Sequence, residues 1–187
     1  MKFFTPELLI RFNSSDDAMA DRADEDWETA IRDYRRHLDE LSDQMSAQLK
    51  KLAGLCLHDA ELLAVDEPMG PFFPVPSAFL DPHWPGFLTW AGFAILSVKQ
   101  GDEIITLIYL LSDHIHRHAS IETWPFSTAR KHWLYDEIDV DPMHPGMFIH
   151  RVLMSNGTVL EIPFFSVLIH DIPLQEGHEG DGSRRIA

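Results

Sequence analysis

The sequence is short of cysteine, of basic residues and of long apolar runs, and each shortage excludes a class of protein. Cys56 is the only cysteine among 187 residues, so no disulfide can form within the chain. Only 15 Lys and Arg accompany 30 Asp and Glu, and the net charge of -15 argues against binding to nucleic-acid phosphates. The apolar run from Ile104 to Leu111 falls far short of the ~20 residues of a membrane span. Glu7 and Arg11 interrupt the N-terminal segment, where a signal peptide would have its apolar core. We therefore expect a cytoplasmic protein.

Signatures of nucleophilic catalysis and of nucleotide binding are also missing. The chain contains neither a G-x-S-x-G sequence nor a glycine-rich phosphate loop. Cys56 stands between Leu55 and Leu57, away from any cation that would favour a thiolate. We therefore predict that Cys56 is a small buried apolar side chain.

The composition and the order of the predicted elements indicate an α+β fold. Apolar residues make up 45% and charged residues 24% of the chain, which is typical of a globular domain. We expect one domain over residues 1–174, in which a long N-terminal amphipathic helix over 16–55 packs on a mostly antiparallel sheet. Ser14 or Ser15 is available to cap this helix. Its apolar residues recur every three or four positions: Trp27, Ile31, Tyr34, Leu38, Leu41, Met45, Leu49 and Leu52.

The remainder of the chain is predicted to be rich in β-structure. Prolines over 68–86 indicate an ordered loop, and the β-rich part follows over 87–172. It contains a hairpin whose second arm, 104–111, is apolar enough for a central strand. A further strand is predicted over 132–140. Asn156-Gly157 suits a type I′ turn between strands over 147–155 and 158–164, a last strand covers 166–172, and 175–187 should be a flexible tail.

Much of the negative charge lies on or just after the predicted helix. Fifteen acidic and six basic side chains fall between Asp16 and Glu67. This asymmetry favours a non-enzymatic binding or regulatory protein whose helix meets a basic partner. The candidate contact residues are Asp24, Glu25, Asp26, Asp39, Glu40 and Asp43. No cofactor is expected in such a protein, and a monomer and a homodimer remain open.

The apolar stripe of the helix leaves a structural alternative open. Trp27, Ile31, Tyr34 and Leu38 follow an approximately heptad spacing, which is also found in coiled-coil dimers. The spacing covers fewer heptads than a stable coiled coil needs. We therefore expect this stripe to pack on the chain's own sheet.

A cluster of histidines supports an alternative function, that of a metal-dependent enzyme. His114, His116 and His118 alternate along the chain and would share one face of an extended strand. The spacing of His116, His118 and Glu122 resembles the H-x-H-x3-E metal motif of cupins. The resemblance implies a divalent metal held by these side chains together with His114, with His150 as a further ligand.

Two further resemblances concern shorter segments. The pair His58-Asp59 resembles the adjacent His-Asp ligands of metal-dependent phosphohydrolases, but it lacks partner ligands at a diagnostic spacing. We expect the pair to cap or anchor the start of a strand through side-chain hydrogen bonds. The segments MKFFTPELLIRFNS and LCLHDAEL resemble the opening of a bacterial family known only as a domain of unknown function. The Asn156-Gly157 hairpin and the segment EIPF that follows it are similar in general residue pattern to small bacterial toxin-immunity proteins. This resemblance implies an immunity or antitoxin role.

Overall fold

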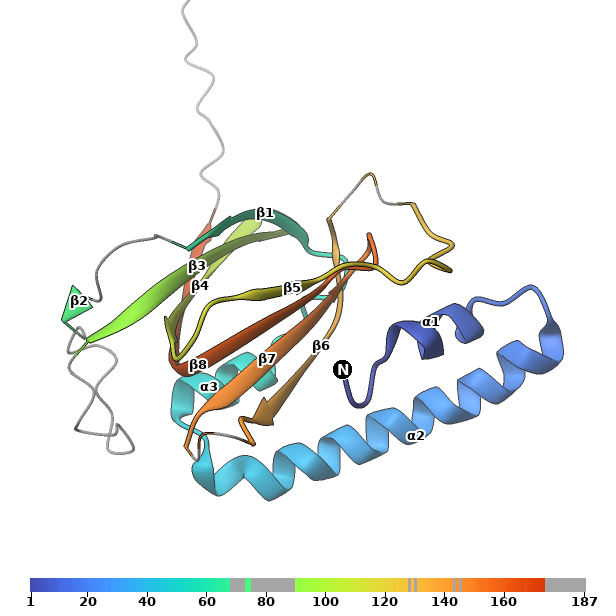
Figure 1. Ribbon diagram of the computed structural model, residues 1–187, viewed down its shortest axis with the longest axis horizontal. Coiled ribbons are helices and arrows are strands. Elements are labelled where there is room, and N and C mark those ends of the chain that lie inside the picture. Colours follow the sequence, from blue (N-terminus) through green and yellow to red (C-terminus); the bar gives the residue numbers. More distant parts are fainter. Residues whose placement is uncertain are drawn as a thin grey trace, which may run out of the picture.

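The computed structural model describes residues 1–67, 73–74, 90–127, 129, 131–142, 144 and 146–173. The proline-rich loop predicted over 68–86 lies outside these residues except for the backbone of 73–74, and so does the tail predicted over 175–187. The described part confirms the α+β class: helices near the N-terminus pack on a curled antiparallel sheet (Figure 1).

The helix predicted over 16–55 is divided into two helices. Helix α2 (Asp17–Leu41) is followed by a short 3-10 helix, η1 (Ser42–Gln44), and then by α3 (Ala47–Ala53). The division occurs because Met45 is extended and Ser46 starts a new helix by accepting a hydrogen bond from the Leu49 amide at 3.2 Å. The break turns α3 toward the interior of the sheet.

Two features of the N-terminal helices differ from expectation. The cap of α2 is Asp16, whose carboxylate accepts a hydrogen bond from the Met19 amide at 3.1 Å, and not Ser14 or Ser15. An additional helix, α1 (Pro6–Phe12), precedes α2 and packs along it (Figure 1). Thr5 caps α1 and proline occupies its first position, where the missing amide hydrogen has no cost.

The sheet is antiparallel throughout and nearly closes on itself. Its strand order is β1-β3-β4-β8-β7-β6, with the short β2 paired to β3 and β5 paired to β8. An isolated bridge between Glu61 and His132 brings the two ends of this order together. The strands are β1 (Glu61–Asp66), β2 (Phe73–Pro74), β3 (Trp90–Gln100), β4 (Glu103–Leu111), β5 (His116–His118), β6 (Trp133–Val140), β7 (Phe148–Met154) and β8 (Val159–Pro173).

The strand predictions are largely confirmed. The β3–β4 hairpin is present, β4 lies between β3 and β8 as a central strand, and β6 matches the strand predicted over 132–140. The two strands expected over 158–164 and 166–172 are one continuous strand, β8, with a register shift opposite Leu110 and Leu111. The extra residue lets the chain continue past Pro163 without ending the strand.

The turn between β7 and β8 is not the predicted type I′ turn. A type I′ turn needs a positive φ at both central residues. Gly157 has a φ of 80°, but Asn156 does not have a positive φ, because Asp59 is the only described residue other than glycine that has one. The loop is instead three residues long, ending on a left-handed glycine. A Cβ at position 157 would lie 2.6 Å from the Trp124 ring, so both the conformation and the packing require glycine here.

Two large hydrophobic cores lie on opposite faces of the sheet, and a third, smaller cluster surrounds Leu110 of β4. The inner core fills the concave face and is closed by α3, whose Leu49 and Leu52 are buried. The outer core lies between the convex face and the helices α1 and α2, and its buried members are Phe4, Leu8, Leu9, Ala23, Trp27, Ala30, Leu153 and Val159. The apolar stripe of α2 therefore packs on the chain's own sheet, as predicted.

The prediction for Cys56 is wrong, because its side chain is exposed. The side chains that flank Cys56 turn inward instead. Leu57 is buried in the inner core and Leu55 packs partly against it, which leaves Cys56 on the outside.

Candidate functional site

The outward side of α2 and η1 carries the six acidic residues selected from the sequence, and all six are exposed. They form two groups, an N-terminal acidic group of Asp24, Glu25 and Asp26 and a C-terminal acidic group of Asp39, Glu40 and Asp43. At ~1.5 Å of rise per residue, the 15 positions from Asp24 to Asp39 separate the groups by about 22 Å. A partner that touches both groups must therefore be an extended surface.

Basic residues modify this surface in two places. Arg11 of α1 binds Asp26 through a contact of 2.9 Å, so one of the six carboxylates is already paired. Arg32 and Arg36 lie between the two groups and pair with acidic residues one helical turn away. Within the described part of the chain, the other five carboxylates, Asp24, Glu25, Asp39, Glu40 and Asp43, form no ion pair.

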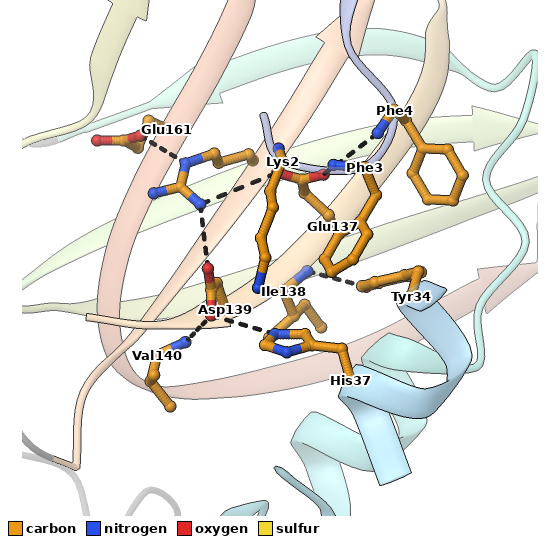
Figure 2. Close-up of polar contacts among 11 residues, drawn as sticks. Lys2, Phe3, Phe4, Tyr34, His37, Glu137, Ile138, Asp139, Val140 and Glu161 are labelled. Carbon is orange, nitrogen blue, oxygen red and sulfur yellow. Dashed lines mark hydrogen bonds and ion pairs between the residues drawn. The ribbon is translucent and has the colours of Figure 1, made fainter. Parts of the chain in front are cut away.

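A buried carboxylate on β6 holds the N-terminal segment against the outer face of the sheet. Glu137 is 1% exposed and accepts hydrogen bonds from the backbone amides of Lys2, Phe3 and Phe4, the second of them at 2.8 Å (Figure 2). These amides satisfy a charge that would otherwise be costly to bury. Residues separated by more than 130 positions in the sequence are thereby joined.

Arg151 of β7 links three acidic side chains of the same surface. Its Nε donates to Glu161 at 2.7 Å, and its Nη1 lies 3.9 Å from Glu137 and 3.7 Å from Asp139. We call Glu137, Asp139, Arg151 and Glu161, together with the amides of residues 2–4, the outer anchor.

Two side chains of α2 reach the outer anchor and position the helix. The Tyr34 hydroxyl accepts a hydrogen bond from the Ile138 amide at 2.8 Å, and His37 Nε2 lies 3.1 Å from Asp139 Oδ1 (Figure 2). Burial, reinforced by the nearby Asp136 carboxylate, raises the pKa of Tyr34 well above its usual value. Tyr34 therefore keeps its proton at neutral pH, and α2 is fixed to β6 by groups facing away from the acidic surface.

A second polar cluster lies on the inner side of the sheet. Tyr109 and His150 are both fully buried, and the Tyr109 hydroxyl lies 2.8 Å from His150 Nδ1. His150 Nε2 lies 3.0 Å from Asp136, whose other oxygen accepts a hydrogen bond from the Trp133 indole at 2.9 Å. Burial and Asp136 raise the pKa of Tyr109 well above its usual value. We call these four residues the inner chain.

The histidines proposed as metal ligands are not brought together. His114 pairs with Glu67 at 2.8 Å, whereas His116 and His118 lie exposed on β5. Glu122 is exposed in the following loop, and both ring nitrogens of His150 are engaged in the inner chain. No three His, Cys, Asp or Glu side chains among the residues that the structure describes are arranged to hold a metal ion. The metal hypothesis thus stays a prediction without an assembled ligand set.

The pair His58-Asp59 serves as an anchor in the turn before β1. His58 Nδ1 lies 2.7 Å from the Leu134 carbonyl oxygen, and the Asp59 amide donates to the Trp133 carbonyl at 2.8 Å. Asp59 takes a φ of 64°, which aspartate tolerates better than most residues. These contacts fit the anchoring interpretation, since they hold the start of β1 against β6.

The outer anchor and the inner chain were not found from the sequence, although one signal was available. Asp136 and Glu137 are adjacent within a predicted strand, so their side chains must point to opposite faces. Where both faces of a strand are covered, two neighbouring carboxylates cannot both reach water, and each then needs a buried partner. The partners themselves come from distant parts of the chain and have no local signature.

No protein-family model, curated protein or solved structure matches this chain. This result is consistent with a family of unknown function, which the opening segments of the sequence resemble. Among the helices described, none has both the length and the apolar character needed to cross a membrane.

Proposed function

We propose that this chain is a non-enzymatic binding protein that recognises a basic protein partner through the outward face of α2 and η1. The observation that carries the proposal is the set of five exposed carboxylates that form no ion pair with any residue the structure describes, presented by a helix whose other side is fixed. Unpaired charges of one sign accelerate encounter with an oppositely charged surface and reject partners of like charge.

The anchoring of α2 supports binding because it removes a cost of association. Trp27 is buried in the outer core, and Tyr34 and His37 hold the helix to β6. A helix that is already ordered loses less conformational entropy when a partner binds. The contact surface is therefore preorganised, with flexibility left only in the acidic side chains themselves.

The proposal has a more specific form, an immunity or antitoxin role. The general residue pattern of the C-terminal hairpin favours this role. In such a pair, an acidic protein covers a basic surface of its target. A chain with a single cysteine suits an encounter in the cytoplasm, where thiols remain reduced.

The test compares two variants of equal charge in the capture of partners from extracts of the source cells. The first variant carries D24N, E25Q, D39N, E40Q and D43N. The matched control neutralises five exposed acidic residues elsewhere, with E7Q, E61Q, D66N, D102N and E103Q. Each substitution removes one negative charge, so five of them change the formal net charge of -15 to -10 in both proteins.

We expect a basic protein to be retained by the wild type and the control and lost by the α2 variant. Its binding should weaken steeply with added salt, because exposed charges are screened. Retention by all three proteins with equal affinity, or capture of an acidic partner only, would contradict the proposal.

A further inference from the structure

A groove lies between residues of β1 and β5. In the ribbon, both strands lie on the side of the molecule remote from α2 (Figure 1). Its volume is about 530 Å³, which is within the range of small-molecule sites. The apolar lining includes Leu62 and Val65 of β1 together with Met154 and Leu160, the last two of which are 2% and 4% exposed. We call this hollow the β1–β5 groove.

The groove concentrates positive charge in a chain that is otherwise acidic. Arg117 and Lys131 both line it, next to the polar side chains of Asn156 and Thr158. No ion pair joins Lys131 to another residue within the described part of the chain. Arg117 makes one long contact, 3.8 Å from Glu67, which leaves most of its five donors available.

Contacts between β1 and neighbouring segments flank the groove at both ends of the strand, and they bear on the kind of ligand that the groove suits. At one end Glu61 bridges His132, and the Leu62 amide donates to the Lys131 carbonyl at 2.9 Å. At the other end the Glu67 carboxylate accepts the Ile115 amide at 3.2 Å and pairs with His114. An extended peptide that paired along the free edge of β1 would have to pass through these contacts, whereas a small molecule would not.

We propose that the β1–β5 groove binds a small amphipathic anion, with an apolar body over Leu62, Met154 and Leu160 and an anionic head between Arg117 and Lys131. The head is a carboxylate or a phosphate monoester, because both accept charge-assisted hydrogen bonds from guanidinium and ammonium groups. The apolar body supplies affinity by removing apolar surface from water. This inference is independent of the acidic face of α2.

The test measures binding of octanoate, octyl phosphate and 1-octanol to the full chain by titration calorimetry. We expect one of the two anions to bind at least about tenfold more tightly than the alcohol, and the tighter one identifies the head group. The double variant R117Q/K131Q should lose about tenfold in affinity for that anion and retain its weak affinity for 1-octanol. The matched control R35Q/K50Q removes the same two charges from exposed positions outside the groove and should bind as the wild type does.

A second readout does not depend on any variant. Amide chemical shifts on addition of the anion should change for residues 62–65, 117–119 and 156–160, and not for the acidic groups of α2. Equal affinity for octanoate, octyl phosphate and 1-octanol would overturn the proposal, as would shift changes confined to another surface. A short peptide of alternating glutamate and leucine that displaces the anion and binds more tightly would identify the groove as a peptide site instead.

Discussion

The two faces of the sheet bury polar groups in different ways. On the inner face, the side chains of Tyr109, His150, Asp136 and Trp133 form a chain of hydrogen bonds that joins the three strands β4, β7 and β6. On the outer face, the Glu137 carboxylate is surrounded by backbone amides of the N-terminal segment and by a guanidinium. The inner chain ties the sheet to itself, while the outer anchor ties distant segments to the sheet.

This difference shows which interactions control the surface proposed for partner binding. The inner chain holds strands that an extensive apolar core and backbone pairing also hold. The position of α2, by contrast, depends on the smaller outer core and on Tyr34 and His37 at β6, and it reaches the inner core only through Leu38 and Leu41 in its last turns. Loss of the outer anchor should therefore disturb the acidic face more than loss of the inner chain.

The largest effect is expected at alkaline pH, because it acts on both faces at once. The pKa values of Tyr34 and Tyr109 are raised, mainly by burial, and that of the half-buried Tyr135 is raised for the same reason. Below about pH 10 these tyrosines keep their protons in the folded and unfolded states alike. Above it, the unfolded chain releases protons that the folded chain retains, so the free energy of unfolding falls as the pH rises.

We expect tyrosinate absorbance to appear together with the loss of far-ultraviolet circular dichroism as the pH is raised past this value. The chain has three tyrosines, all of which have raised pKa values, so little absorbance should precede unfolding. Full ionisation of all three with the dichroism unchanged would show that the two buried hydroxyls are accessible in the folded protein.

The next largest effect is expected from E137Q on the outer face. In glutamine an NH2 group replaces one carboxylate oxygen, so N–H donors would face the backbone N–H groups that Glu137 now accepts from. Arg151 also loses one of its negatively charged neighbours. Breaking a buried charged interaction in this way costs about 3 kcal/mol of unfolding free energy. The matched control is E161Q, whose carboxylate contacts the same arginine but is 25% exposed, and for which we expect about 1 kcal/mol.

The two variants are compared by urea denaturation and by hydrogen exchange of α2. E137Q should also increase exchange over residues 17–41, because the N-terminal segment that covers α2 is released. Equal losses of stability in E137Q and E161Q, with unchanged exchange in α2, would show that the outer anchor does not control the helix.

A smaller effect is expected from the inner chain, and it should be strongly non-additive. H150L leaves the Tyr109 hydroxyl and Asp136 without their partner, at a cost of about 2 kcal/mol, and Y109F removes only one hydrogen bond, at about 1 kcal/mol. In the double variant, the Tyr109 hydroxyl that H150L leaves without a partner has itself been removed. Its loss should therefore be smaller than the sum of the two single losses, and strict additivity in urea denaturation would argue that the two side chains do not interact.

The sequence predicted the elements that depend on local pattern and missed those that depend on distant contacts. The apolar stripe of α2, the central position of β4 and the strand β6 follow from periodicity and composition. The outer anchor joins residues 2–4 to residue 137, and no local signal encodes that pairing. The apolar neighbours of Cys56 predict a buried side chain, but Leu55 and Leu57 face the inner core while Cys56 between them is exposed.

The division of the predicted helix was open to prediction, and it supplies the smallest effect. Ser46 caps α3, which closes the inner core, and Asp16 caps α2, which covers the outer core. S46A should cost about 1 kcal/mol, because the Leu49 amide loses its acceptor at the start of the helix that closes the inner core. D16A should cost less, since its cap lies at an exposed first turn that can fray. S15A is the control, as Ser15 is exposed next to the cap of α2, and it should leave the thermal midpoint unchanged. Equal midpoints for S46A and S15A would mean that the break after α2 is set by the packing of Met45 and Leu49 rather than by the cap.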